Sequence, residues 1–90
     1  MVEFEWDEDK RRSNIEKHEL DFLVARRLFD GRPTVASTSQ RNDESRNVTT
    51  GLLSKQYFTV VWFWREDKVR IISFRRANRA EEREHRAVYG

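Results

Sequence analysis

Arginines alternate with aromatic residues near the C-terminus of this 90-residue chain, and these residue types could act on nucleic acid. Between Arg65 and Ala80 there are six basic and two acidic residues. Guanidinium groups bind phosphate through paired hydrogen bonds, and aromatic rings stack on unpaired bases, so the pattern suits an RNA-binding surface. The same pattern fits a hairpin whose rings form the core and whose charges are solvated, and the sequence leaves both interpretations open.

Histidine is the residue type whose protonation ordinarily changes near neutral pH, and the chain has two, His18 and His85. His18 follows Lys17 at the end of a predicted helix, where a positive charge interacts favourably with the helix dipole. It could therefore cap the helix or act in acid–base catalysis. The histidines lack the HExxH spacing and the chain has no cysteine, so we expect no metal site and no cofactor.

Composition and charge narrow the class of protein. The absence of GxSxG, P-loop and GxGxxG motifs leaves the corresponding hydrolase and nucleotide-binding classes without support. Residues 1–24 carry 4 basic and 8 acidic groups, whereas residues 25–64 and 65–90 carry a net charge of +3 each, which indicates an anionic partner on the C-terminal side. No apolar run approaches the ~20 residues of a membrane span, and the acidic N-terminus is unlike a secretory signal. We therefore expect a cytoplasmic protein that forms one domain over residues 1–90 and has no membrane contact.

A strand and a polar helix are predicted at the N-terminus. Val2–Trp6 alternates apolar and polar residues, which is typical of a half-buried strand. Asp7 is a suitable N-cap for a helix over residues 7–17, in which Ile15 is the only strong apolar anchor. This helix positions Lys17 and His18 at its end.

A second helix and a surface loop are predicted next. Apolar residues over 20–29 have near-helical spacing, with Asp21 as a candidate N-cap, and the glycine and proline within residues 30–33 end this helix. Residues 34–36 could form a short strand. Residues 37–47 are polar and without periodicity, so we expect a surface loop there.

The C-terminal half is predicted to form three strands and a helix. Residues 46–53 form the weakest strand, whereas residues 56–65 are rich in aromatic and β-branched residues and are the most strand-like stretch. Glu66 and Asp67 are suited to a hairpin tip, followed by a return strand over residues 68–76 and a helix from Ala77 to about Ala87. The predicted order is β-α-α-β-β-β-β-α, an α+β fold with an antiparallel sheet packed against the N-terminal helices and followed by a C-terminal helix.

The predicted hairpin has a definite register if its loop has two residues. The expected pairs are Arg65 with Lys68, Trp64 with Val69, Phe63 with Arg70, and Trp62 with Ile71. Strict alternation then predicts one face made of Phe58, Val60, Trp62, Trp64, Val69, Ile71, Ser73 and Arg75. The other face is predicted to hold Tyr57, Thr59, Val61, Phe63, Arg65, Lys68, Arg70, Ile72, Phe74 and Arg76.

Four separated segments carry a family pattern. They are Phe4–Asp7; then Asn14, Lys17, His18, Phe22, Ala25, Phe29 and Asp30; then Glu44, Arg46 and Gly51; and finally Val69–Ser73, Arg75–Ala77, Glu82 and Tyr89. In this order they resemble the BrnT toxins of bacterial type II toxin–antitoxin systems over nearly the whole chain. The resemblance implies a RelE-like fold and a metal-independent endoribonuclease that inhibits translation, uses the 2′-hydroxyl of its RNA substrate as nucleophile and leaves a cyclic phosphate.

The resemblance, taken with the residue types available, also implies roles for particular side chains. Those expected to be catalytic are His18 for proton transfer, Arg46, Arg65 and Arg75 as phosphate and transition-state contacts, and Ser73 to orient an oxygen. Those expected to grip or stack RNA are Lys17, Arg70, Arg76, Trp62 and Trp64. Arginines that point apart, or that are held in internal ion pairs with no open cleft between them, would contradict this site.

The implied partner is a cognate antitoxin with a ribbon–helix–helix DNA-binding part, and the complex is expected to bind operator DNA. Basic and aromatic surface suits such an antitoxin as well as it suits RNA. Three residues depart from the family pattern, because Glu19 replaces a usual glycine, Phe63 a small polar residue and Phe74 an alanine. They favour the alternative of a weak or inactive homologue that acts as a protein- or nucleic-acid-binding module. Self-association through the aromatic face is a third possibility.

Overall fold

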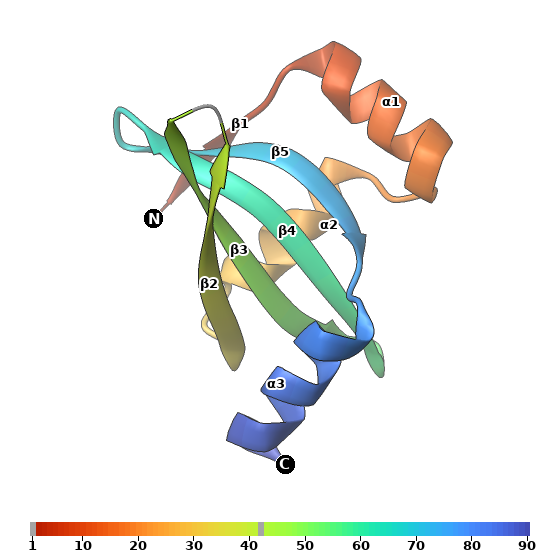
Figure 1. Ribbon diagram of the computed structural model, residues 1–90. Helices are drawn as coiled ribbons and strands as arrows, with labels where there is room; N and C mark the ends of the chain where they lie inside the picture. Colours follow the sequence, from red (N-terminus) through yellow and green to blue (C-terminus); the bar gives the residue numbers. More distant parts are fainter. Residues whose placement is uncertain (1, 42) are drawn as a thin grey trace.

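The computed structural model describes residues 2–41 and 43–90 and shows an α+β fold with helices on both faces of a five-stranded sheet (Figure 1). The elements are β1 (Glu3–Glu5), α1 (Glu8–His18), α2 (Phe22–Ala25), the 3-10 helix η1 (Arg26–Phe29), β2 (Thr34–Arg41), β3 (Glu44–Leu53), β4 (Gln56–Arg65), β5 (Lys68–Arg76) and α3 (Arg79–Tyr89). Their order along the chain is the expected one. The sheet order is β1-β5-β4-β3-β2, and β1 runs parallel to β5, so the sheet is mixed and the prediction of a purely antiparallel sheet was wrong.

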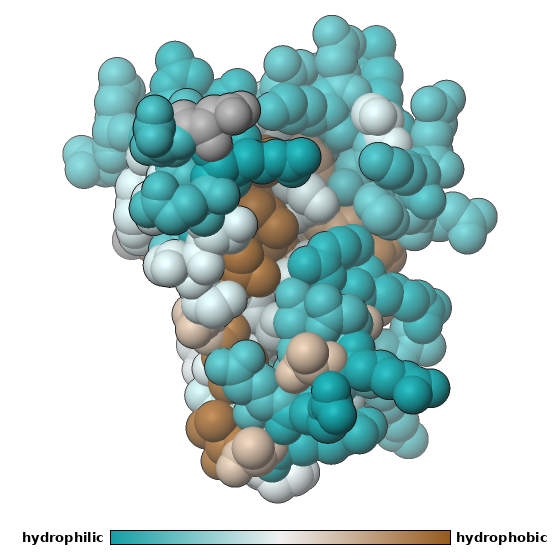
Figure 2. Space-filling view, in the orientation of Figure 1, coloured by the Kyte–Doolittle hydropathy of each residue, from teal (hydrophilic) through white to brown (hydrophobic). Residues whose placement is uncertain are grey.

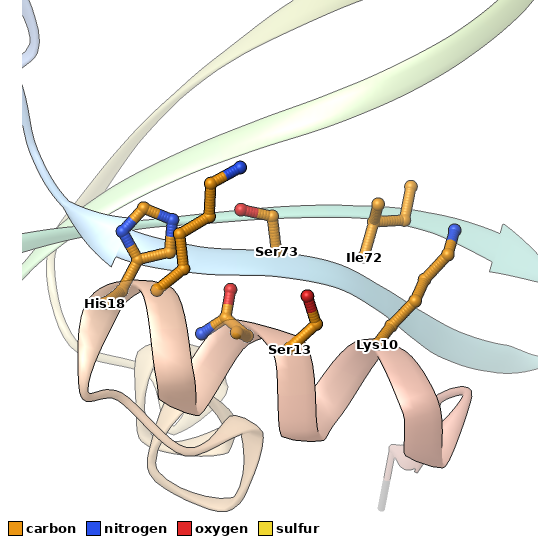
Figure 3. Close-up of a pocket in the computed structure, with 7 residues that line it drawn as sticks. Lys10, Ser13, His18, Ile72 and Ser73 are labelled. Carbon is orange, nitrogen blue, oxygen red and sulfur yellow. The ribbon is translucent and has the colours of Figure 1, made fainter.

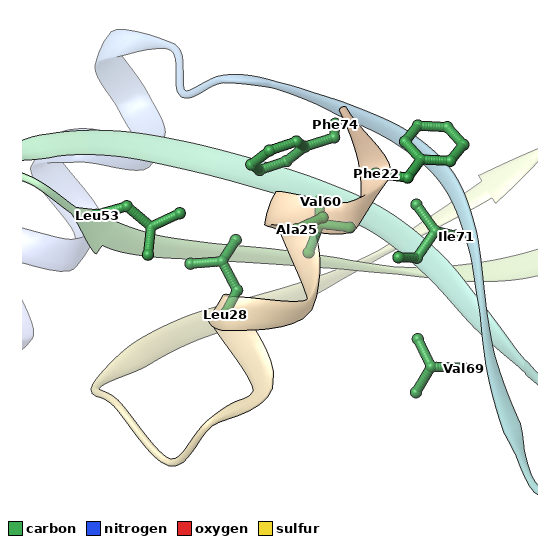
Figure 4. Packing of buried hydrophobic residues seen from close by; sticks show 8 residues of the cluster. All are labelled: Phe22, Ala25, Leu28, Leu53, Val60, Val69, Ile71 and Phe74. Carbon is green, nitrogen blue, oxygen red and sulfur yellow. The ribbon is translucent and has the colours of Figure 1, made fainter. Parts of the chain in front are cut away.

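The core lies between α2, η1 and one face of the sheet. Its buried apolar side chains are Phe22, Ala25, Leu28, Leu53, Val60, Val69, Ile71 and Phe74 (Figure 4). Gly51 on β3 allows η1 to approach closely, because a Cβ atom there would lie 2.6 Å from the Leu28 side chain. We call this the covered face of the sheet. The opposite face, which α3 crosses at one end in Figure 1, is called the open face.

A β-bulge in the β4–β5 hairpin decides which side chains share a face. The register from the tip to the Trp62–Ile71 pair is as predicted, but Val61 then pairs with Ser73 and Val60 with Phe74. One extra residue on β5 therefore reverses the alternation beyond Ile71. Phe74 turns into the core, where it is fully buried, and Ser73 and Arg75 move to the open face. The predicted faces were wrong from this point onward.

The edge of β5 beyond β1 is completed by a side chain of α1. β1 pairs with β5 only as far as Arg70. At Phe74 the Asn14 side chain accepts a hydrogen bond from the backbone N–H at 3.1 Å and donates one to the backbone C=O at 2.8 Å. Asn14 also donates to the Leu20 carbonyl, at 2.9 Å. It is buried, whereas Ile15 is 36% exposed, so the prediction that Ile15 anchors this helix was wrong.

The caps of the N-terminal helices are those predicted. Asp7 accepts a hydrogen bond from the Asp9 N–H at the start of α1, and Asp21 accepts one from the Leu23 N–H at the start of α2. Arg11 donates two hydrogen bonds to the Asp21 carboxylate, at 2.8 and 2.9 Å. These bonds, together with one from the Leu23 N–H, lower the pKa of Asp21. α1 is thus tied both to β5 and to the N-cap residue of α2.

The segment predicted as a loop over residues 37–47 is instead most of a β-hairpin. β2 extends from Thr34 to Arg41 and pairs in register with β3, which begins at Glu44; position 42 lies outside the described residues. Most of β2 is exposed on both faces at the sheet edge, so its serines and threonines show no alternation. The remaining strands match the predicted ranges closely, and α3 begins two residues later than expected, with Asn78 as its N-cap.

Glu19 ends α1 in a conformation that usually belongs to glycine. Its φ is 58° and its ψ is 31°, and its N–H bonds to the Ile15 carbonyl. A side chain with a Cβ atom in this left-handed region costs about 1 kcal/mol relative to glycine. The turn after His18 therefore keeps the geometry that a glycine would give, at a local energetic cost.

No helix among residues 2–41 and 43–90 has the length and apolar character of a membrane span.

We expect Asn14→Ala to lower the free energy of unfolding by about 2–4 kcal/mol, because the Phe74 N–H and C=O lose their partner in a buried position. The neighbouring substitution Ile15→Ala is the matched control and should cost about 1 kcal/mol or less. Urea denaturation of both variants measures the difference. Equal losses would show that the edge of β5 does not depend on Asn14.

Glu19→Gly is expected to raise the free energy of unfolding by about 0.5–1 kcal/mol, because glycine removes the steric cost of the positive φ. Glu16→Gly, within the same helix, should lower it by about 1 kcal/mol. Thermal denaturation of both variants tests this. A loss of stability for Glu19→Gly would show that the left-handed conformation carries no strain.

Candidate functional site

A groove runs between α1 and the β5 edge. It has a volume of about 240 Å³ and is lined by Lys10, Ser13, Asn14, Lys17, His18, Ile72 and Ser73 (Figure 3). We call it the α1–β5 groove. None of these side chains is acidic, so its charge comes from two lysines and, when protonated, the imidazole of His18. A concave site of this charge favours an anion.

Helical spacing brings the α1 side chains to one side of the helix. Lys10, Ser13 and Lys17 are three and four residues apart, which is the spacing of neighbours on a helix surface. Figure 3 shows the side chains of Lys10, Ser13 and His18 rising from α1 toward β5, while Ser73 projects from β5. The bulge at Val61 and Trp62 is what gives Ser73 this position.

Arginines and one aromatic ring form a row across the open face. Phe63 on β4 pairs with Arg70 on β5. Arg46 on β3 comes directly before Asn47, whose pairing with Trp62 puts Arg46 on the open face beside Phe63. A half-buried phenylalanine therefore lies between arginines of the two neighbouring strands. Arg65 lies two residues from Phe63 and is on the same face. Because strands are about 4.8 Å apart, Arg46 is about 10 Å from β5.

Carboxylates pair with each of these arginines. Glu5 on β1 is 2.9 Å from Arg70 and 3.7 Å from Arg65, and Glu44 is 3.6 Å from Arg46. The two longer contacts are weak, and the Arg65 side chain is 58% exposed. The Nε of Arg46 is buried and has no hydrogen-bond partner among the described residues.

Arg75 is held much more firmly, by Glu81 of α3. Two guanidinium nitrogens donate to the two oxygens of this carboxylate, at 2.8 and 3.0 Å. Thr59 also donates to Glu81, and its hydroxyl is 2.7 Å from that of Thr50. Arg75 therefore binds α3 to the open face, and its guanidinium already has an anionic partner.

The pKa of Glu81 reflects opposing influences. Burial alone would raise it, but the hydrogen bonds from Arg75, from the Asn78 backbone N–H and from Thr59 hold the pKa below its usual range. The same pairing raises the pKa of Arg75.

Three residues expected to bind RNA lie away from this groove. Trp62 and Trp64 are on the covered face with Val69 and Ile71, and the Trp62 indole donates to Thr49 at 2.9 Å. Arg76 pairs with Phe58 and has its guanidinium carbon 5.9 Å from the centre of the Phe58 ring. The prediction that the two tryptophans share a face with Ser73 and Arg75 was wrong, because the bulge separates them.

Phe63 and Phe74, two of the residues that depart from the family pattern, lie in different parts of the structure. Phe74 is in the core and cannot narrow the groove. Phe63 is half-buried on the open face, and Figure 2 shows apolar surface on this side of the molecule between more polar regions.

Sequence reasoning missed Lys10 and Ser13. Ser13 and Lys17 come three and seven residues after Lys10, and this spacing indicates that the three side chains share one side of a helix. It was overlooked because α1 has a polar surface on nearly every side.

No cluster of three or more histidine, aspartate or glutamate side chains that could hold a metal ion occurs in the described part of the chain.

A protein-family model described as the ribonuclease toxin BrnT of type II toxin–antitoxin systems matches residues 6–81. The chain belongs to the BrnT toxin family. The match covers every residue that lines the α1–β5 groove and the whole β4–β5 hairpin of this BrnT protein. Membership implies endoribonuclease activity and a cognate antitoxin as partner. No curated protein matches the chain.

The pKa of Glu81 is lowered in the folded protein. The stabilisation that Glu81 contributes is therefore present above its pKa in the unfolded chain, which is about 4.3, and is lost as the pH falls through its pKa in the folded protein. We expect Glu81→Gln to lower stability at pH 7 and to weaken the pH dependence between about pH 5 and pH 3. Glu82→Gln, one residue along α3, is the matched control. Urea denaturation at several pH values measures both, and parallel pH profiles for the two variants would contradict the role of Glu81.

Proposed function

We propose that this BrnT-family protein cleaves RNA without a metal ion and that the scissile phosphate binds in the α1–β5 groove. The observation that supports this best is the joint presence of His18, Ser73 and two lysines in a concavity without carboxylates. A phosphodiester is an anion whose negative charge grows in the transition state, so such an environment favours both binding and cleavage. The match to the ribonuclease toxin family points to the same substrate.

The chemistry assigned to the groove is an in-line transfer. The 2′-oxygen of the ribose attacks the adjacent phosphorus, a bond from that oxygen to phosphorus forms, and the bond from phosphorus to the 5′-oxygen breaks. His18 accepts the proton of the 2′-hydroxyl, and the departing 5′-oxygen takes a proton from water. Lys10 and Lys17 hold the non-bridging oxygens, and the Ser73 hydroxyl orients one of them. The product is a 2′,3′-cyclic phosphate.

The rest of the substrate is proposed to lie across the open face. Arg46, Arg65 and Arg70 would contact further phosphates, and Phe63 would stack on an unpaired base. The weak pairs of Arg46 and Arg65 leave them able to exchange a carboxylate for a phosphate. Arg75 has a different role in this proposal, because it positions α3 through Glu81.

The wider biological role follows from family membership. We propose a RelE-like toxin that inhibits translation in the cytoplasm by cleaving RNA and is neutralised by an antitoxin with a ribbon–helix–helix part. The complex of the two would bind operator DNA through the antitoxin.

A catalytically weak homologue is the second candidate. The observation that favours it is the engagement of Arg70 and Arg75 by carboxylates at 2.9 and 2.8 Å. In that case the protein would bind its partner or RNA without cleaving either.

Cleavage of a single-stranded RNA in EDTA separates the two candidates. We expect the wild-type protein to cleave and to leave a cyclic phosphate, while a 2′-O-methyl RNA stays intact. His18→Gln should lower kcat by about 100-fold or more, because proton transfer by a positioned side chain contributes about that much. Lys17→Gln should weaken binding, and Lys55→Gln, on the β3–β4 turn, should behave like wild type.

Several outcomes would contradict these assignments. An RNA left intact by the wild-type protein, together with no growth arrest on expression, would support the inactive homologue. Cleavage that needs an added divalent ion would disprove metal independence. A His18→Gln protein with wild-type kcat and an unchanged pH–rate profile would remove His18 from the reaction. If Arg75→Ala abolishes cleavage while Glu81→Gln does not, Arg75 contacts the substrate directly.

A further inference from the structure

A chain of aromatic rings extends from the core to the surface on the covered face. Phe4 contacts Phe29, Phe29 contacts Trp62 and Trp62 contacts Trp64 edge to face, with ring centres 5.3, 5.2 and 5.2 Å apart. Trp64, the last in the chain, is 57% exposed. The helices of this face, α2 and η1, span only residues 22–29 and leave the hairpin end of the face uncovered.

Two hollows meet at this uncovered end. One, of about 370 Å³, is lined by Val2, Phe4, Leu23, Arg26, Arg27 and Asp30. The other, of about 540 Å³, is lined by Val2, Trp64, Glu66 and Asp67. Val2 and Leu23 are also largely exposed, at 44% and 43%. We call the joined surface the Trp64 patch; exposed apolar surface of this kind, centred on a tryptophan, is typical of a protein interface.

The two ends of the Trp64 patch have opposite charge. Arg26 and Arg27 lie at one end and are exposed, and neither forms an ion pair within the described residues. Asp30 beside them is already bound to Arg32 at 2.7 Å. Glu66 and Asp67 lie at the other end, exposed and likewise without an ion pair in the described ranges. The patch has no excess of positive charge, which disfavours RNA as its ligand.

We infer that the Trp64 patch is the docking surface for an amphipathic helix of the cognate antitoxin; this inference rests on the toxin role proposed above. The apolar side of the helix would fill the hollows beside Trp64, Val2 and Leu23. Acidic residues at one end would meet Arg26 and Arg27, and basic residues at the other would meet Glu66 and Asp67. A second copy of the chain fits less well, because two hollow surfaces facing each other would enclose empty space.

The Trp64 patch and the α1–β5 groove are on different sides of the sheet. Trp64 and Ser73 lie on opposite faces because of the bulge. An antitoxin anchored on the Trp64 patch therefore holds the toxin from the side that does not receive RNA, and any block of the groove comes from another part of the antitoxin.

Calorimetric titration of the full-length toxin with its purified cognate antitoxin tests the inference. Leu23→Ser and the double variant Arg26→Glu/Arg27→Glu should each weaken binding by about 10- to 100-fold, the size expected for residues central to an interface. Val88→Ser, which removes an exposed apolar side chain from α3, and Arg79→Glu/Arg83→Glu are the matched controls and should bind like wild type. Leu23→Ser should cleave RNA at the wild-type rate when no antitoxin is present.

Three results would overturn the inference. The first is wild-type affinity for the antitoxin in both Leu23→Ser and the arginine double variant. The second is a wild-type dimer in analytical ultracentrifugation that Leu23→Ser dissociates, which would assign the patch to a second copy. The third is a loss of RNA binding in Trp64→Ser, which would assign it to RNA. A wild-type protein that binds antitoxin through this patch but cleaves no RNA would refute the ribonuclease proposal and leave the docking surface intact.

Discussion

The structure depends on how the unpaired edge of β5 is satisfied. β1 covers this edge only as far as Arg70, and a buried N–H and C=O left beyond it would be costly. The Asn14 side chain bonds to both groups at Phe74 and so takes the place of a strand. This contact aligns α1 with β5, and the alignment is what turns the polar side of a surface helix into one wall of a groove. Arg11 and Asp21 reinforce it at the junction with α2.

Some cationic side chains are in ion pairs and others are not, and this difference affects which ligands each face of the sheet can bind. On the open face Arg70 and Arg75 form short ion pairs, whereas Lys10 and Lys17 in the groove form none within the described residues. The two lysines beside His18 are therefore better placed to bind a phosphate than Arg70 and Arg75, which the sequence analysis had emphasised. The covered face has a mixed charge and an exposed tryptophan ring, which suit a protein partner. One bulge, at Val61 and Trp62, divides these two capacities between the faces.

Local sequence signals predicted the elements well but not the side-chain directions beyond the bulge. The caps Asp7 and Asp21 and the two-residue hairpin tip are local features, and each was found as expected. The bulge was not predictable, because an extra residue on β5 is stabilised by the packing of Phe74 in a distant core. The exposed strand β2 lacks the alternation that reveals half-buried strands. Asn14 belongs to the family pattern, but its contact with β5 was not predictable, since only the tertiary structure shows which backbone groups need a partner.

Amide chemical-shift mapping with a single-stranded 2′-O-methyl RNA tests the role of the groove most directly, because this RNA binds without being cleaved. We predict that the largest shifts occur in residues 10–18 and 72–73, followed by the open-face row around Phe63. Large shifts confined to the covered face, around Leu23 and Trp64, with the groove amides unmoved, would contradict the assignment of the α1–β5 groove as the RNA site.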